Sequence, residues 1–324
     1  MKKKIETLEV VLPKNQLNLF GYEKHFKSFM QLYEKNKLPN TILLSGPRGL
    51  GKATFAYHFI NYMLSINDSN IYSTEDMTIN PKSFCYKSIM NNTNPNFALL
   101  DCDIGGETIK VDKVRSILNF LSKSTYSSDI KIVLIDNAEY LNTHAANALL
   151  KALEESNNRT FFFIIHNSYK KILDTIRSRC IEFKFFFTIP EKEKILKNII
   201  NYYDANFNLN NIDNSFYFDT PGNILRYLLI FKDTNINFSK DKFECILYLI
   251  DKYGIKNDDE SLSIISSFVE LFYRDLSISK NKDFNIYSMN KNKLLKKIND
   301  AKLFNLDKKN LFTSLISTLG HETK

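Results

Sequence analysis

A glycine-rich segment has the residue types and spacing of a phosphate-binding loop. Residues 45–54 read SGPRGLGKAT, and Gly46, Gly51 and Lys52 fit the spacing G-x-x-x-x-G-K. Glycines let backbone N–H groups close around phosphate oxygens, and the lysine reaches the terminal phosphates. Ala53 follows the lysine, where a nucleotide-hydrolysing enzyme has the Ser or Thr that holds magnesium. The segment therefore predicts a loop that can bind phosphate but hydrolyses a nucleotide poorly. A chance turn or a structural relic is the alternative.

Two other residues of this segment bear on nucleotide binding. Gly49 adds a third glycine inside the loop. Thr54 offers the nearest hydroxyl, but it stands one residue too late, which turns it by roughly 100° around a helix. We expect Thr54 to point away from a magnesium site unless the loop slips by one residue.

A second catalytic feature is also incomplete. The apolar run 131–136, KIVLID, ends in Asp136, whose carboxylate suits a contact with magnesium, direct or through water. An ATPase of this type usually has Glu next, to position the attacking water. This chain has Asn137, which cannot accept a proton. Glu139 stands two residues further on and faces either the same side or another one. An ordinary strand end is the alternative interpretation.

Two arginines after the next apolar run could serve a neighbouring site. Arg179 lies between Ser178 and Cys180, whose small side chains would let it project. An arginine finger is a rigidly held guanidinium that contacts the transferring phosphate of an adjacent site. It is worth on the order of 10³ to 10⁵ in rate. For both Arg177 and Arg179, a surface salt bridge is the plainer alternative.

Two further polar residues are candidates for nucleotide contact. Asn167 ends the apolar run around 161–165 and either touches a γ-phosphate or serves as a turn residue. Arg226, after Pro221 and Gly222, either reaches a nucleotide from a lid or is a solvated helix arginine. The catalytic candidate is thus Arg179, and the nucleotide-binding candidates are Gly46, Gly49, Gly51, Lys52, Thr54, Asp136, Asn167 and Arg226.

These residues fall on an alternation of strands and helices. Asn142 suits the N-cap of one of the helices, and the polar stretch 65–96 reads as an irregular insertion. Strands that are apolar throughout and alternate with helices predict a parallel sheet covered on both faces. We expect strands at 41–45, 97–101, 131–136 and 161–165, and helices at 52–64, 110–122 and 142–155.

The alternation weakens after about residue 187. Helices at 191–203 and 223–231 predict a small helical lid, and only helices are indicated from residue 241 onward. The polar stretch 232–240 suits a boundary. The expected organisation is a core at 1–187, a lid at 188–235 and an all-α domain at 236–324.

Composition indicates a globular, cytoplasmic protein. The net charge of +8 comes from 44 Lys and Arg against 36 Asp and Glu. It permits nucleic-acid contact, but the Lys-, Asn- and Ile-rich composition that AT-rich codons produce explains it as well. The four cysteines are scattered without C-x-x-C spacing, which predicts free thiols in a reducing compartment. No apolar run approaches the roughly 18 residues of a membrane span, and the start, MKKKIETLEVV, is a poor secretory signal.

Three segments, in this order, resemble the AAA+ clamp-loader subunits of bacterial DNA polymerase III. They are SGPRGLGKAT at 45–54, IVLIDNAEYLNTHAANALLKALEES at 132–156 and IRSRCIEF at 176–183. The resemblance is specific over about residues 20–187 and is strongest to the delta-prime branch. It implies an α/β P-loop AAA+ core, a small lid and a C-terminal helical collar.

The resemblance also implies a role in DNA replication. In this family five subunits form a ring that loads the sliding clamp on primed DNA, and the partners would be gamma/tau ATPases and delta. The delta-prime member usually hydrolyses no ATP, and its Ser-Arg-Cys arginine, here Arg179, completes the neighbour's site. One alternative is a gamma/tau-type motor ATPase, against which Ala53 and Asn137 count. Another is a stand-alone AAA+ ATP-binding protein.

The chain departs from the family pattern in two respects. Many members carry a four-cysteine zinc knuckle in the insertion after the first helix, but only Cys85 lies in that region here. One thiol cannot make a tetrahedral site, so we expect no zinc. Many delta-prime members also have a more eroded phosphate loop than this one. Binding of ATP or ADP with magnesium, without turnover, therefore stays open.

Overall fold

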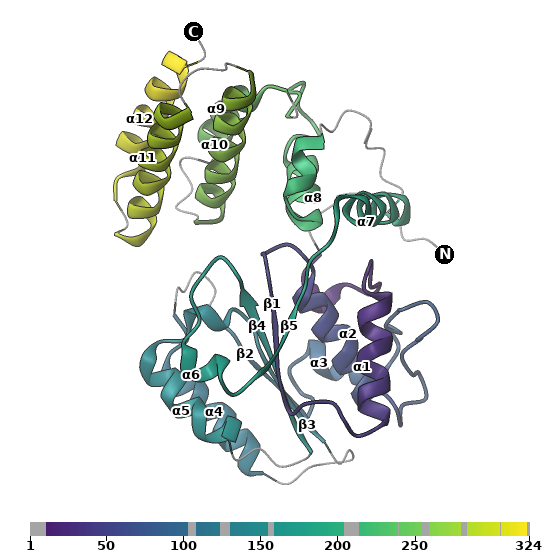
Figure 1. The fold of residues 1–324 in the computed structure, drawn as a ribbon. Helices are drawn as coiled ribbons and strands as arrows, with labels where there is room; N and C mark the ends of the chain where they lie inside the picture. Colours follow the sequence, from purple (N-terminus) through teal and green to yellow (C-terminus); the bar gives the residue numbers. More distant parts are fainter. Residues whose placement is uncertain are drawn as a thin grey trace. The chain divides into compact units, whose positions relative to one another are not determined.

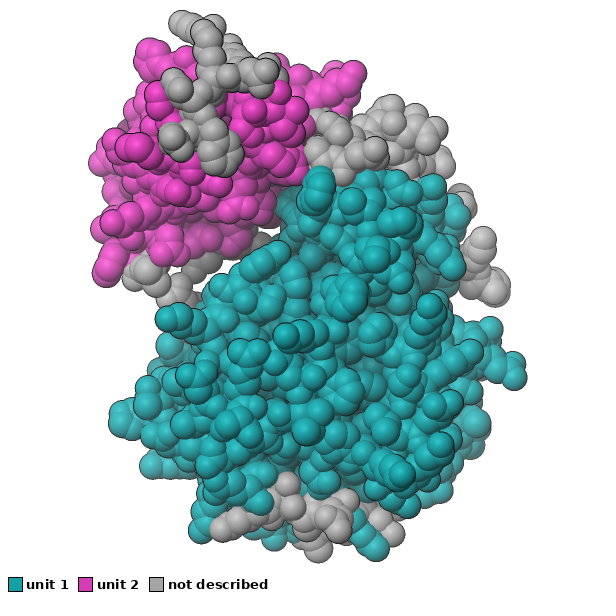
Figure 2. Space-filling view, in the orientation of Figure 1, with its two compact units in different colours: residues 1–207, 217–229 teal, residues 208–216, 230–324 magenta. Residues whose placement is uncertain are grey.

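The chain divides into two compact units. The computed structural model describes residues 11–102, 108–123, 130–154, 159–203, 214–238, 240–253, 259–279, 284–304 and 306–322, so the segment judged a poor secretory signal lies almost entirely outside it. The first unit comprises 1–207 and 217–229, and the second comprises 208–216 and 230–324 (Figure 2). The predicted domain boundaries after residues 187 and 235 stay predictions.

A five-stranded parallel sheet forms the centre of the first unit, with the strand order β2-β3-β4-β1-β5 (Figure 1). The four predicted strands are confirmed. The inner strands β3 and β4 are buried along nearly their whole length, as their continuous apolar runs require. β5 was not predicted, because this short edge strand is only partly buried. The strands are β1 (Thr41–Gly46), β2 (Phe97–Leu100), β3 (Lys131–Ile135), β4 (Thr160–Asn167) and β5 (Ile181–Lys184).

Helices cover both faces of this sheet (Figure 1). Alternate residues of β1 point to opposite faces, so that Ile42 joins one core cluster and Leu43 the other. α1 (Glu23–Glu34), α2 (Lys52–Leu64) and α3 (Phe84–Met90) pack on the first face. α4 (Val111–Ser122), α5 (Thr143–Glu154) and α6 (Asp174–Arg177) pack on the second. The predicted parallel sheet with helices on both sides is thereby confirmed.

Local hydrogen bonds explain where several helices begin. The Asn142 side chain accepts a hydrogen bond from the Ala145 backbone N–H at 2.8 Å, which confirms the predicted N-cap of α5. The insertion is not wholly irregular, because Ser83 caps α3 within it. The Asp68 carboxylate, in turn, accepts hydrogen bonds from the Ser83 hydroxyl at 2.8 Å and the Cys85 N–H at 3.1 Å.

The remaining described elements are helical. In the first unit, α7 (Ile189–Tyr202) begins where Glu191 accepts a hydrogen bond from the Thr188 N–H, and α8 (Pro221–Ile230) follows. Short 3-10 turns are η1 (Pro13–Asn15), η2 (Ala138–Tyr140) and η4 (Asn214–Phe218). The second unit contains α9 (Lys242–Tyr253), α10 (Asp259–Ser279), α11 (Phe284–Leu303) and α12 (Lys308–Glu322). These four pack as neighbours, and the all-α character predicted for the C-terminal part is confirmed.

Candidate functional site

The carboxyl ends of the central strands bring most of the candidate residues to one edge of the sheet. Gly46 at the end of β1 pairs in register with Asn167 at the end of β4. Asp136 follows β3, and Asp101 follows β2, in the same direction. Ligands of parallel α/β sheets bind at this edge, outside the carboxyl ends of the strands.

The glycine-rich loop connects β1 to α2, as its motif requires. Gly49 and Gly51 have φ angles of 86° and 85°, in the left-handed region that favours glycine. Lys52 opens α2 and is buried, and its Nζ donates hydrogen bonds to the carbonyl oxygens of Gly46 and Pro47 at 2.7 Å each. The lysine is therefore held over the loop at the N-terminus of a helix, a geometry that fits a bound phosphate.

The outer carbonyls of this loop are bonded by residues that are remote in sequence. The Tyr22 hydroxyl donates to the Leu50 carbonyl oxygen at 2.7 Å. The Thr220 hydroxyl donates to the Arg48 carbonyl oxygen at 2.9 Å, and the Gly222 N–H donates to the Gly49 carbonyl oxygen at 2.9 Å. The start of α8 therefore lies directly on the phosphate loop. Sequence reasoning missed Tyr22 and Thr220, because nothing local marks such long-range partners.

The acids at the sheet edge form a repelling cluster beside Lys52. Burial, together with the nearby Asp101 carboxylate, raises the pKa of Asp136 to about 6. Burial lowers the pKa of Lys52 to about 8, although the charges of Glu139 and Asp136 act against that shift. Magnesium in nucleotide sites is bound through one or two carboxylates together with the phosphates of the nucleotide, and Asp136 and Asp101 fit that smaller requirement. Ala53 has no hydroxyl to add to these ligands.

Asn137 occupies the position where an ATPase of this type usually has Glu, and its contacts are structural. With a φ of 55°, its N–H donates to the Asp136 carboxylate at 2.8 Å, and its side-chain amide donates to the Asp101 carboxylate at 2.9 Å. Asn137 thus ties together two neighbouring acids. An amide that is so engaged cannot act as the base for an attacking water.

Glu139 faces the site, a point that the sequence left open. Its carboxylate accepts a hydrogen bond from the Asn167 backbone N–H at 3.1 Å, and its charge acts on both Lys52 and Asp136. Thr54 and Arg226 are both partly buried in α2 and α8, and their roles stay predictions.

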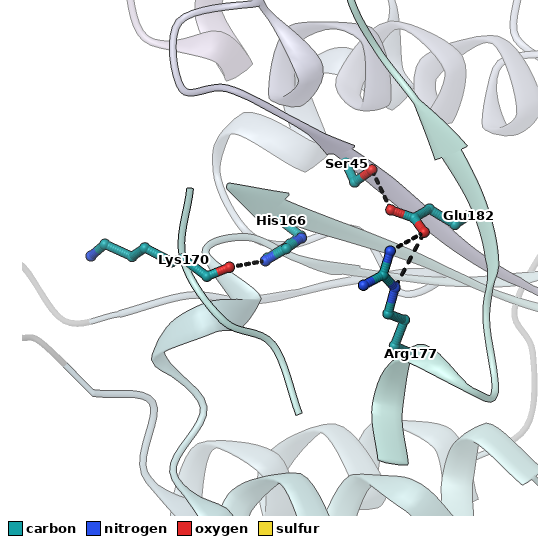
Figure 3. Close-up of polar contacts among 5 residues, drawn as sticks. All are labelled: Ser45, His166, Lys170, Arg177 and Glu182. Atoms are coloured by element: carbon teal, nitrogen blue, oxygen red, sulfur yellow. Dashed lines mark hydrogen bonds and ion pairs between the residues drawn. The ribbon is translucent and has the colours of Figure 1, made fainter. Parts of the chain in front are cut away.

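The arginine segment is joined to the strand that leads into the phosphate loop. The Arg177 guanidinium binds the Glu182 carboxylate through Nε at 3.2 Å and Nη2 at 2.7 Å. The Ser45 hydroxyl, one residue before the loop glycine, donates to the same carboxylate at 2.6 Å. Figure 3 shows both groups converging on Glu182, with His166 of β4 nearby. Arg177 therefore makes the salt bridge that was weighed as the plainer alternative.

Arg179 is held through both its backbone and its side chain. The Thr41 hydroxyl donates to the Arg179 carbonyl oxygen at 2.6 Å. The guanidinium pairs with Glu154 and donates to the Thr175 carbonyl oxygen at 2.9 Å. The side chain nevertheless stays 33% exposed, so the group lies at the surface.

Two other features bear on the kind of site. Within the described ranges, no group of three or more His, Cys, Asp or Glu side chains could hold a metal ion. None of the helices in the described part of the chain is long and apolar enough to cross a bilayer.

The fold and the site together define a P-loop core of the AAA+ class. The glycine-rich loop follows β1, which lies between β4 and the edge strand β5 of the parallel sheet. An acid follows the apolar strand β3, and the arginine segment precedes β5. The chain belongs to the family described as "DNA polymerase III, delta subunit", which matches residues 21–187. The family resemblance seen in the sequence is thereby confirmed.

The chain is also similar to individual proteins. The chain is 30% identical over 152 residues to the DNA polymerase III subunit delta' of Pseudomonas aeruginosa, covering 47% of this chain and 44% of that protein. It is 30% identical over 173 residues to the subunit gamma/tau of Mycoplasma genitalium, covering 53% and 28%. A solved gamma subunit-related protein from Thermotoga maritima is 16% identical, with a TM-score of 0.48 and coverage of 91% and 99%. The chain spans about half the length of the delta' relatives it matches.

Proposed function

We propose that the chain is a delta-prime-type clamp-loader subunit that lends Arg179 to the ATP site of a neighbouring subunit. The observation that carries the proposal is the contrast between two sites. The chain's own site has Ala53 and Asn137 where magnesium and water should be positioned. Arg179, in contrast, is anchored at its backbone and reaches the surface. The activity of the protein is then assistance to a partner rather than ATP turnover of its own.

The proposed partners are gamma/tau ATPases and delta in a heteropentamer, which would load a sliding clamp on primed DNA in the cytoplasm. Delta' and gamma subunits both occur among the relatives of this chain, which supports an assembly of several subunits. DNA contact would come through the assembled ring, mainly to phosphates. Assembly is tested by mixing the chain with its partner subunits and measuring the mass of the complex. A chain that stays monomeric beside every partner favours a stand-alone AAA+ protein.

We further propose that the loop binds ATP or ADP with magnesium without efficient hydrolysis. Gly46, Gly49, Gly51 and Lys52 would hold the phosphates, and Asp136 would face the magnesium ion. Thr54, Asn167 and Arg226 are secondary candidates. A zinc ion is not part of the proposal, because Cys85 is the only thiol in the insertion.

The orientation of Glu139 favours a second candidate function, a gamma/tau-type motor ATPase. A carboxylate near both Lys52 and Asn167 could position a water in place of the missing Glu. Steady-state ATP hydrolysis by the purified chain, with magnesium and primed DNA, separates the two functions. Absence of turnover supports the delta-prime type. Robust turnover that is lost in Glu139→Gln establishes the motor.

A further inference from the structure

We infer that Glu154 is a positioning residue that fixes the Arg179 guanidinium in the orientation needed to grip a phosphate of the neighbouring subunit. The inference rests on the proposed function and assigns a role to a second residue of the same site. Glu154 is the last residue of α5, and Arg179 follows α6, so the pair joins two separate elements.

The contacts leave two N–H donors of the guanidinium for a ligand. Nε donates to the Glu154 carboxylate at 2.6 Å, Nη2 pairs with the same carboxylate, and Nη1 donates to the Thr175 carbonyl oxygen at 2.9 Å. A guanidinium has five N–H donors in a rigid plane. Three are used by these contacts, which leaves one N–H on Nη1 and one on Nη2. The contact from Nη1 to the Ser178 hydroxyl is long, at 3.4 Å, and a phosphate oxygen would displace it.

These remaining donors suit a phosphate. Two N–H groups on the two terminal nitrogens of one guanidinium can bind two oxygens of one phosphate, the arrangement that Arg provides and Lys does not. The pair is open to solvent, with side chains 33% and 51% exposed, so a neighbouring nucleotide can approach it. A group held in advance in its reacting orientation loses no reorganisation energy at the moment of reaction.

The role is tested with Glu154→Gln in a reconstituted loader. The partner ATP sites that Arg179 does not serve are silenced by substituting their phosphate-loop lysines, so that turnover reports one site. We expect Glu154→Gln to lower kcat about three- to thirtyfold with KM unchanged, since misplacement of a catalytic group by about 1 Å can cost up to 10²-fold. Glu34→Gln is the matched control, because Glu34 is an exposed acid far along the chain from Arg179 whose carboxylate accepts a hydrogen bond from the Tyr62 hydroxyl at 3.1 Å.

A double variant separates positioning from a merely structural role. In the Arg179→Ala background, Glu154→Gln should cause no further loss, because the guanidinium that it orients is gone. Additive losses overturn the inference, and so does an unchanged or increased kcat in the single variant. If Arg179→Ala itself leaves turnover unchanged, the proposed function fails, which is a different result. Melting curves of every variant confirm that each one folds.

Discussion

Thr41 and Arg179 lie 138 positions apart in the chain, yet the Thr41 hydroxyl donates a hydrogen bond of 2.6 Å to the Arg179 carbonyl oxygen. Thr41 is the first residue of β1, and Ser45 near the end of the same strand bonds Glu182, which in turn binds Arg177. The strand β1 therefore leads into the phosphate loop at its carboxyl end, and its side chains also bond the arginine segment and β5. The segment that would serve a neighbour is fixed to the chain's own core.

Thr41→Val should loosen this attachment while keeping the shape of the side chain. The Arg179 carbonyl loses its hydroxyl donor, and we expect a loss of about 1 kcal/mol in the free energy of unfolding. Urea unfolding monitored on the first compact unit measures this change. Thr313→Val serves as the control, because Thr313 is exposed and its hydroxyl donates to the Lys309 carbonyl oxygen one turn earlier in the same helix, α12. Equal stability of Thr41→Val and the wild type would contradict the anchoring role.

Asp136 should make the protein less stable as the pH rises. Its folded pKa of about 6 lies above the ordinary value near 3.9, so the folded state holds this proton more tightly than the unfolded state does. The stabilisation is present below pH 4 and is lost as the pH rises through 6. Between pH 4 and 7.5 we expect a loss on the order of 2 kcal/mol from this group. Denaturant unfolding across that range measures it.

Asp136→Asn should remove that pH dependence and stabilise the protein at pH 7.5. The amide oxygen can still accept the bond from the Asn137 N–H, but it carries no charge for Asp101 to repel. Asp76→Asn, at an exposed acid of the insertion, is the control. If Asp136→Asn keeps the wild-type pH profile, another group is responsible. A destabilising acid at this position is understandable if it is retained for a ligand.

Gly222→Ala should disturb the contact between α8 and the phosphate loop. A Cβ at Gly222 would lie 2.6 Å from the Gly49 carbonyl oxygen, which is backbone and cannot swing aside. We expect a loss of about 1 to 3 kcal/mol in stability, measured by thermal melting. At Gly320 of α12 the nearest atom to a new Cβ is a Phe243 carbon at 3.6 Å, an ordinary contact. Gly320→Ala should therefore be neutral or slightly stabilising, and a similar loss in both variants would show that the loop contact is not the cause.

Asp68 should support the insertion in its ionised form. Partial burial alone would raise the pKa of this carboxyl, but hydrogen bonds from Cys85, Ser83 and Asn70 outweigh it and lower the pKa. Its contribution is therefore present at neutral pH and is lost as the pH falls below about 4 through the folded pKa. Asp68→Asn should cost about 1 kcal/mol at pH 7, a modest value because solvent screens the charge. Acid unfolding checks this, and a variant as stable as the wild type at pH 7 refutes it.

Elements with strong local signals could be predicted from the sequence. The runs IVLI at 132–135 and FFFII at 161–165 are apolar at every position, which only a buried strand or helix tolerates, and their flanking turns indicated strands. The Asn142 cap and the bounds of α2 were equally local. Elements without such signals were missed, among them β5, which is exposed at both ends, and α3, which depends on Asp68 from fifteen residues earlier.

The residues of the candidate site could likewise be predicted only where the signal is local in the sequence. The loop glycines and Lys52 are adjacent in sequence, so their cradle could be predicted. The orientation of Glu139 and the contacts of Tyr22 and Thr220 became visible only once strands and helices were placed, because these contacts with the site cross from one element to another. The Glu154 side chain illustrates the same limit, since its partner lies 25 residues further along the chain.

The most direct test of the account is ATP turnover at the neighbouring site of a reconstituted loader that contains Arg179→Ala, with Arg115→Ala as the matched control. Arg115 is likewise a surface arginine paired with an acid, Asp112, but it lies on α4. The account predicts that Arg179→Ala folds, joins the complex and lowers single-site turnover on the order of 10³-fold, while Arg115→Ala retains wild-type turnover. Wild-type turnover in the assembled Arg179→Ala complex would contradict the claim that this chain completes its neighbour's site.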